Sequence, residues 1–342
     1  MKHEAKRIFP GLLRVLPLAL SLAVCACSSE AAIQNIIGSG TEVPVFLGCQ
    51  VTGRRDMVFR FSVPVEVVFL RFNPSVEVSA AAGGETVHVS FLEDPGEGER
   101  LTADMLVKDR GGNTLNVLVP FRTRNERMPE FVITELRTEY SKPRVEFVEF
   151  FTSTAGNLGA LRLFIASSGT DTPVFEFPPA EVRAGEYIVL HLRTLENESV
   201  NETGNDLGVS GGNEASAQAR DFWVPGSAKL LRKSDAVFFT DQDDRIIDAV
   251  LLSENPDAWW NKEELSLAAS FVGEQGAWLQ GEHPERNAPG PKDAVPAAGT
   301  TPTRTICRDE SAADSNSALD WYICAASSAS PGAQNSTKRY SP

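Results

Sequence analysis

Short runs of alternating apolar and polar residues, broken by turn-forming residues, are the feature that most limits how this chain can fold. From Glu130 to Leu192 the runs EFVITEL, VEFVEFF and LRLFI are separated by polar turns such as SKPR. Alternation with a period of two places one set of side chains on one face of a strand, and turn residues between such runs are typical of antiparallel pairing. This stretch therefore predicts paired antiparallel strands.

The same pattern precedes Glu130. Between residues 43 and 122 the runs MVFRFSV, VEVVFLRF, VEVSA, TVHVSFL, ADMLVKD and TLNVLVPF are separated by NPS, AAGGE, EDPGEGE and RGGN. Several short strands with turn signals between them predict a sandwich or barrel. The charged segment FRTRNERMPE then predicts a linker. With 342 residues, the chain is expected to be all-β, with two sandwich domains in tandem at 43–122 and 130–336.

Three segments of the second domain depart from this pattern. Residues 196–219 are rich in Asn, Gly, Ser and Glu and predict a long exposed loop. AVFFTDQDDRIIDAVLL predicts a hairpin with an acidic turn. NKEELSLAASFV predicts one short helix, with Asn261 as its N-cap and an apolar face. The residues of that face are Leu265, Ala268, Ala269 and Val272.

The N-terminus has the pattern of an export signal. MKHEAKR is basic, LLRVLPLALSLAV is apolar, and CACSSE follows. The apolar run is much shorter than the roughly 20 residues that a membrane-spanning helix needs, so a signal peptide at 1–26 is predicted. Cys27 stands where bacterial lipoproteins carry the acylated cysteine, and Cys25 is the second choice because Val24 is large for a cleavage position. Residues 27–42 would form a tether. The alternative to a lipoprotein signal is an ordinary secretory signal with incidental cysteines.

The chain is acidic, with a formal net charge of -14. An acidic surface repels phosphate backbones, so nucleic-acid binding would need a local basic patch, and the sequence shows none. Acyl chains on Cys27 would attach the protein to a bilayer, because more than one chain gives stable anchoring.

Two sets of motifs resemble known families. The order ITEL, EFVEFF, ALRLF and AGEYIVL resembles the lamin-tail domain, a small immunoglobulin-like β-sandwich of bacterial exported proteins, and the last segment resembles the end of that domain. The residues that carry the second likeness are Arg304, Asp314, Asn316, Asp320, Trp321, Pro331, Gly332 and Asn335. FRFSVPVE and MLVKDRGGNTL resemble the first strand and last hairpin of bacterial immunoglobulin-like domains. The whole chain resembles treponemal lipoproteins, and the resemblance implies structural residues and no catalytic set.

The cysteines outside the leader suggest a cross-link. Cys307 and Cys324 flank a polar loop, each on a predicted strand, which suits a disulfide in an oxidising compartment. A metal site is the alternative, but companion ligands are missing from the neighbouring sequence. Cys49 is expected to be a buried strand thiol, since no basic residue lies beside it.

Acidic residues give two further hypotheses. Asp241, Asp243, Asp244 and Asp248 would suit calcium, but they lack the EF-hand pattern, so an ordinary turn is favoured. The paired-carboxylate candidates for acid–base chemistry are Glu135, Glu146 and Glu149. For Glu135 and Glu149 the lamin-tail resemblance implies a structural hydrogen bond instead.

Aromatic and imidazole side chains complete the candidates. Trp259 and Trp260 could form an exposed patch for a glycan or protein, although packing of the helix onto the sandwich is favoured. His88 and His191 alternate with apolar residues and are expected to be ordinary strand residues. The sequence thus favours a lipid-anchored, non-enzymatic binding or structural module of the cell envelope, with an envelope or host protein or glycan as partner. The alternatives are a periplasmic hydrolase around Glu135, Glu149 and the Asp241 turn, and a calcium-stabilised adhesin.

Overall fold

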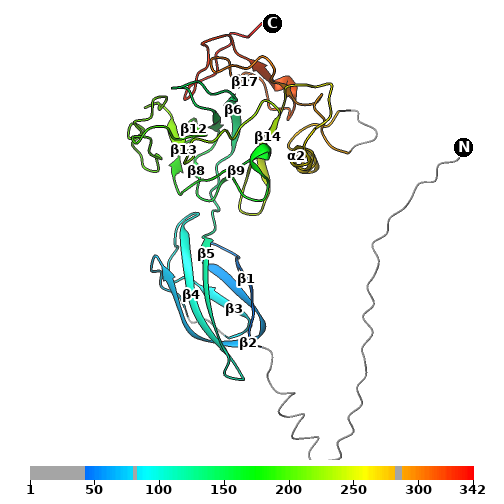
Figure 1. Cartoon of the computed structure of the whole chain (residues 1–342). Coiled ribbons are helices and arrows are strands. Elements are labelled where there is room, and N and C mark those ends of the chain that lie inside the picture. The colour runs from blue at the N-terminus through cyan, green and yellow to red at the C-terminus, as the bar shows by residue number, and fades with distance from the viewer. Residues whose placement is uncertain (1–42, 80–82, 282–286) are drawn as a thin grey trace, which may run out of the picture. The chain divides into compact units, whose positions relative to one another are not determined.

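The computed structural model describes residues 43–79, 83–281 and 287–342 (Figure 1). Cys25, Cys27 and the expected signal peptide and tether lie outside the described residues. Among the described residues, no helix has the length and the apolar character needed to cross a bilayer.

The first part of the chain forms one antiparallel sheet, with the order β1-β2-β4-β5 and with β3 also paired to β2. Its strands are β1 (Phe46–Val51), β2 (Asp56–Asn73), β3 (Gly84–Ser90), β4 (Arg100–Asp109) and β5 (Thr114–Arg122). The inward residues of these strands alternate with outward ones and form their own core, which includes Phe59, Val89 and Met105. The sheet curls around this core.

Strand β2 explains the curl. It has 18 residues, pairs through its first part with β3 and through its second part with β4, and shifts register at Val67/Phe69. The runs MVFRFSV and VEVVFLRF, expected as two strands, therefore form one. The expected strand VEVSA contributes only an isolated bridge between Val78 and Phe91.

The second part packs two larger sheets against one another. One has the order β10-β9-β14-β15-β16, and the other β13-β12-β7-β6-β17-β18. The six-stranded sheet consists of β6 (Phe131–Arg137), β7 (Phe147–Thr152), β12 (Tyr187–His191), β13 (Arg220–Trp223), β17 (Ile306–Arg308) and β18 (Trp321–Ile323). The five-stranded sheet consists of β9 (Arg162–Ile165), β10 (Phe175–Glu176), β14 (Asp235–Thr240), β15 (Ile246–Ser253) and β16 (Val295–Pro296). Strands β8 (Gly156–Asn157) and β11 (Glu181–Val182) pair separately. The expected all-β sandwich architecture is confirmed.

The core between these sheets is rich in aromatic side chains. Phe150 of β7 contacts Phe131, Phe177 and Phe239, with ring centroids 4.5–5.8 Å apart. The hairpin predicted from AVFFTDQDDRIIDAVLL is confirmed as β14 and β15. These contacts fix which face of the six-stranded sheet points inward.

Helix α2 (Glu263–Glu274) packs on the five-stranded sheet through the four predicted residues of its apolar face. The predicted N-cap is wrong, because the cap position is Lys262, whose side chain makes no capping hydrogen bond. Glu263 and Glu264 in the first turn complement the helix dipole instead.

The outer face of the six-stranded sheet is also covered. Residues 196–219 lie over it, and Ala219 packs with Phe147 and Val189 in a small second core. The predicted loop is confirmed as irregular, but it is not simply exposed, because Glu202 and Ser210 are buried. The C-terminal segment from Ser330 to Asn335 covers a neighbouring part of the same face. Polar side chains on this face are therefore enclosed.

Candidate thiol–carboxylate site

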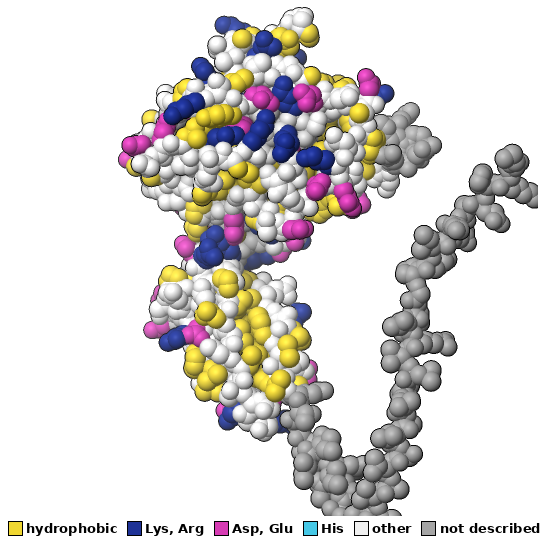
Figure 2. Space-filling model, in the orientation of Figure 1, with side chains coloured by type: hydrophobic (Ala, Val, Ile, Leu, Met, Phe, Trp, Pro, Cys, Tyr) yellow, Lys and Arg dark blue, Asp and Glu magenta, His cyan; other side chains and the backbone are white. Residues whose placement is uncertain are grey.

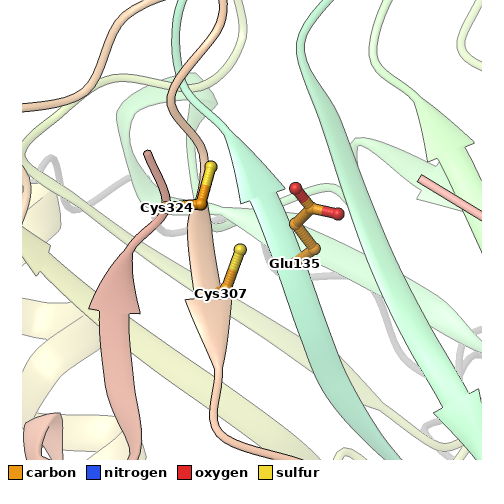
Figure 3. Close-up of side chains that lie close together, drawn as sticks. All are labelled: Glu135, Cys307 and Cys324. Carbon is orange, nitrogen blue, oxygen red and sulfur yellow. The ribbon is translucent and has the colours of Figure 1, made fainter. Parts of the chain in front are cut away.

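Strand register gathers four polar side chains on the outer face of the six-stranded sheet. Cys307 lies directly opposite Glu135 in the pairing of β17 with β6. Thr305 lies two residues before Cys307 and opposite Cys324, and the Cys324 N–H donates to the Thr305 carbonyl. Side chains two residues apart on a strand share a face. Figure 3 shows Glu135, Cys307 and Cys324 projecting to the same side from neighbouring strands. One carboxylate oxygen and both sulfur atoms lie within 4.8 Å of one another.

The hydroxyl of Thr305 joins these groups. It donates a hydrogen bond to Oε1 of Glu135 and lies 3.1 Å from Sγ of Cys324 and 3.6 Å from Sγ of Cys307. The Thr305 N–H also points at Sγ of Cys324, at 3.3 Å. All four side chains are fully buried. The result is a compact, water-shielded cluster of potential ligands.

Burial and hydrogen bonding shift the ionisation of this cluster. Burial raises the pKa of Glu135 to about 7, against the opposing effect of the Thr305 hydroxyl. The hydrogen bond between the two thiols lowers the pKa of Cys324 to about 6 and raises that of Cys307. The contact between the two thiols thus shifts their pKa values in opposite directions.

Glu149 extends the cluster onto β7. It lies directly opposite Glu135 and is fully buried. Burial, followed by the nearby charge of Glu135, raises its pKa well above the usual range. Its Oε1 accepts from the Thr134 hydroxyl at 2.7 Å, and its Oε2 accepts from the Gly332 N–H at 2.6 Å.

The C-terminal segment closes over both carboxyl groups. The N–H of Ser330 donates to Oε2 of Glu135 at 3.1 Å, and Nδ2 of Asn335 donates to the Thr134 carbonyl at 2.8 Å. Gly332 has φ +84°, and a Cβ there would lie 2.9 Å from the Cβ atoms of Ala219 and Ser216. The segment can therefore approach this closely only with glycine at that position.

A second polar group lies under the 196–219 loop. Nε2 of His191 is 2.7 Å from Oδ1 of Asp221, and its ring stacks on Trp223 with centroids 3.8 Å apart. Nδ1 of His191 has no hydrogen-bond partner among the described residues. His191 is thus hydrogen-bonded and buried, whereas His88 is exposed.

One serine near this histidine was not singled out from the sequence. Ser210 is the serine of GVSGG, which fits the G-x-S-x-G pattern of serine hydrolases. That pattern needs a turn between a strand and a helix, but Ser210 lies in the irregular loop. Its hydroxyl accepts from Nε1 of Trp223 at 2.8 Å. No hydrogen bond joins it to His191 among the described residues, so the group is not arranged as a nucleophile and its base.

The acidic turn between β14 and β15 is satisfied by arginines and by its own backbone. Both oxygens of Asp243 bind the Arg124 guanidinium, at 2.7 and 2.6 Å, and Asp244 binds Arg162 at 2.9 Å. Asp241 accepts N–H groups of its own turn. Asp248 is buried away from the turn, 3.3 Å from Arg308. These carboxylates do not converge on one point, as the turn interpretation expects.

The remaining sequence candidates are placed as follows. Trp260 is buried, with Nε1 donating to the Pro289 carbonyl at 3.0 Å, and Trp259 is half-buried against the same core. The packing interpretation of Trp260 therefore holds, and an exposed patch that includes it is wrong. Cys49 is half-buried on β1, and burial raises the pKa of its thiol. Glu146 is fully buried and binds Arg193 through both oxygens.

Cys307 and Cys324 are free thiols in the structure. Cys307 on β17 pairs with Tyr322 of β18, and Cys324 follows two residues after Tyr322. The two cysteines are therefore diagonal neighbours and do not lie directly opposite one another. The disulfide stays a prediction. The sequence did not show that Glu135 lies beside these two thiols. Glu135 is 170 residues before Thr305, and only the pairing of β6 with β17 brings it to them.

Comparison with known proteins gives two matches. The family model TP_1001_2nd, described as protein second domain, matches residues 129–323. An uncharacterized protein of Treponema pallidum (strain Nichols) is 30% identical over 199 residues, which cover 56% of this chain and 50% of that protein. The chain thus spans about half the length of this relative. No solved structure matches.

Proposed function

This chain belongs to the TP_1001_2nd family, and we propose that it acts as a non-enzymatic binding or structural module of the cell envelope. The matched segment contains all strands of the two larger sheets and helix α2. In this proposal the segment 130–336 is a lamin-tail domain, and residues 43–122 form an immunoglobulin-like spacer. Asn335 and Asp320 support that assignment, because the side chains of both make hydrogen bonds to the backbone. Asn335 donates to the Thr134 carbonyl, and Asp320 accepts from the Ser315 N–H.

The anchor in this proposal is lipid on Cys27, with Cys25 as the second choice. Removal of the leader would leave the acylated cysteine 16 positions before Val43, the first described residue, and the residues between them would form the tether. The protein would then be exported and held on a bacterial membrane.

A row of apolar side chains on the first sheet carries the binding part of the proposal. Three apolar residues share the outward face of this sheet: Phe69 on β2, Leu106 on β4 and Leu118 on β5. Phe69 pairs with Leu106. Leu118 pairs with Asp104, which lies two residues before Leu106 on β4 and so points to the same face. Leu118 is 70% exposed and Phe69 is 40% exposed. Figure 2 shows apolar side chains over the surface of this part of the chain. Neighbouring exposed apolar residues are typical of an interaction surface.

The buried carboxyl groups support a structural interpretation over a hydrolase. Glu135 and Glu149 accept hydrogen bonds from Ser330 and Gly332 of the C-terminal segment, which lies over them. A general acid or base must reach the proton that it transfers. With the segment in place, neither carboxyl group is open to a polymer substrate.

The anchor is tested by intact mass spectrometry of the protein extracted in detergent from its native cells. We expect an acylated N-terminus that Cys27→Ser loses and Cys49→Ser keeps. An unmodified chain that begins elsewhere would remove the anchor from the proposal. If Cys25→Ser loses the acylation and Cys27→Ser keeps it, the lipid anchor is on Cys25.

The binding surface is tested by crosslinking in intact cells, with Phe69→Ser/Leu118→Ser compared with wild type. We expect one set of envelope partners, reduced by at least about tenfold in the double variant, with an unchanged melting temperature because both side chains are outward. Leu319→Ser is the matched control, since Leu319 is 93% exposed and lies on the other domain. Equal partner recovery from all three proteins would contradict the assignment of this surface.

A further inference from the structure

We propose that Glu135, Cys307 and Cys324 bind one zinc ion when the thiols are reduced. Among the residues that the structure describes, this is the one group of three or more Cys, His, Asp and Glu ligand atoms that lie within 4.8 Å of one another. The site is independent of lipid anchoring and of the apolar row on the first sheet.

The chemistry of the ligand set selects the metal. Two sulfur atoms favour soft or borderline ions over calcium and magnesium, which prefer all-oxygen sites. Zinc accepts both sulfur and carboxylate ligands and is usually four-coordinate. With three ligands from the protein, one position would remain for a further oxygen ligand.

The backbone holds the three side chains in place before any ion binds. Cys307 and Glu135 face one another across a ladder, and the backbone hydrogen bond from Cys324 to Thr305 fixes the third residue beside them. Figure 3 shows the three side chains on one side of their strands. Such preorganisation lowers the entropic cost of binding.

Residues around the ligands form a supporting layer. The Thr305 hydroxyl contacts all three ligand groups, and Ser330 donates to Glu135 through its N–H. Outer-layer hydrogen bonds of this kind orient metal ligands and are worth about 10- to 100-fold in affinity.

The charge of the cluster also favours a cation. Two thiolates and one carboxylate would place up to three negative charges in a fully buried site, beside the carboxyl group of Glu149. Arg137 lies near Glu135, but its guanidinium already binds Glu214. Uncompensated buried charge is costly, so a divalent cation would stabilise the ionised ligands.

Zinc and a Cys307–Cys324 disulfide exclude one another, since each uses both sulfur atoms. Disulfides need Cβ atoms about 3.8 Å apart, whereas diagonal neighbours in an antiparallel pair are usually farther apart. The diagonal placement of Cys307 and Cys324 therefore favours a bridging ion over a direct bond.

The test uses the full chain, extracted in detergent and reduced, with its thiols counted before titration. Zinc is titrated against a chromophoric chelator, and cobalt is used as a spectroscopic substitute. We expect one equivalent of zinc and a cobalt spectrum with thiolate charge-transfer bands. Cys307→Ser and Cys324→Ser should lose those bands, Thr305→Val should weaken zinc by about 10- to 100-fold, and Cys49→Ser should match wild type.

X-ray absorption on zinc-loaded wild type gives a measurement that does not depend on variants that fold. It should show two sulfur neighbours at about 2.3 Å and lighter neighbours at about 2.0 Å. Reduced protein with free thiols that binds no zinc would overturn the proposal. So would stoichiometric binding that survives in both cysteine variants, or an all-oxygen and nitrogen coordination shell.

Discussion

Glu135 and Glu149 face one another directly across the β6–β7 ladder, and both carboxyl groups are fully buried. Like charges in opposed positions are destabilising, and burial adds a desolvation cost for each ionised form. The C-terminal segment is held through these two groups. The strength with which the C-terminal segment is attached therefore depends on the ionisation of Glu135 and Glu149.

Glu149→Gln is expected to change the free energy of unfolding by less than about 1 kcal/mol, because Gln has nearly the same shape. Its amide oxygen can still accept from the Gly332 N–H, and its amide NH2 can donate to the Thr134 hydroxyl. Glu149→Ala should cost about 3 kcal/mol, since it removes two acceptors and leaves a cavity. Chemical denaturation of the three proteins measures both effects. Equal losses for Gln and Ala would mean that the ionised carboxylate is required. Loss of a hydrolytic activity in a folded Gln variant would favour the hydrolase alternative.

Asp235 predicts a pH dependence of stability. Its oxygens accept from the N–H groups of Ser167, Arg232 and Ala236, but burial outweighs these bonds and raises its pKa from 3.8 to about 6. The folded state therefore binds this proton more tightly than the unfolded state. The stabilising contribution of the protonated group is complete below about pH 4 and is lost as the pH rises through about 6.

Relative to Asp235→Asn, wild type should lose roughly 3 kcal/mol as the pH rises from about 3 to about 7, at about 1.4 kcal/mol for each unit of pKa. Denaturation curves at several pH values give the difference between the two proteins. A difference that stays constant from pH 4 to pH 7 would contradict the raised pKa.

Gly332→Ala tests the close approach of the C-terminal segment. The new methyl group would lie 2.9 Å from two Cβ atoms, at φ +84°. Gly185→Ala is the matched control, because Gly185 has φ +83° and no atom within 4 Å of an added Cβ. The control should lose about 1 kcal/mol from backbone strain, and Gly332→Ala roughly 1–3 kcal/mol more from the collision. Similar losses in calorimetry would show that the segment moves aside freely.

Glu214→Ala tests how the 196–219 loop is held. Both oxygens of Glu214 bind Arg137, at 2.8 and 2.6 Å, and Oε2 also accepts from the Val145 N–H at 3.0 Å. Removal would leave the buried guanidinium of Arg137 unpaired, at a cost of roughly 3 kcal/mol. Amide hydrogen exchange should rise in the loop, whereas the exposed Glu198→Ala in the same loop should leave it unchanged. Unaltered exchange in Glu214→Ala would contradict this role.

Local sequence patterns predicted most individual elements of the fold. Alternation and turn residues predicted the β14–β15 hairpin and the β6–β7 pair, and helical spacing predicted the buried face of α2. The N-cap of α2 was wrong because Asn261 lies one residue before the cap position and Lys262 takes it without a side-chain bond.

Features that depend on strand register could not be predicted in this way. Nothing between Ser62 and Val65 shows that β2 continues through and changes partner from β3 to β4. Likewise, the neighbours of Cys307 in the sequence include no carboxylate that reaches it, whereas β6 supplies Glu135. A shift of one residue in that pairing would turn Glu135 to the opposite face.

The pairing of β6 with β17 also has a kinetic consequence. Glu135 and Thr305 are 170 positions apart, so this edge of β6 stays unpaired until almost the whole domain has been synthesised. Contacts of such high sequence separation slow folding, and an open strand edge can pair with another chain in the meantime. We therefore expect the last stage of folding to be the arrival of β17 beside β6, and the growing chain to depend on protection from aggregation until then.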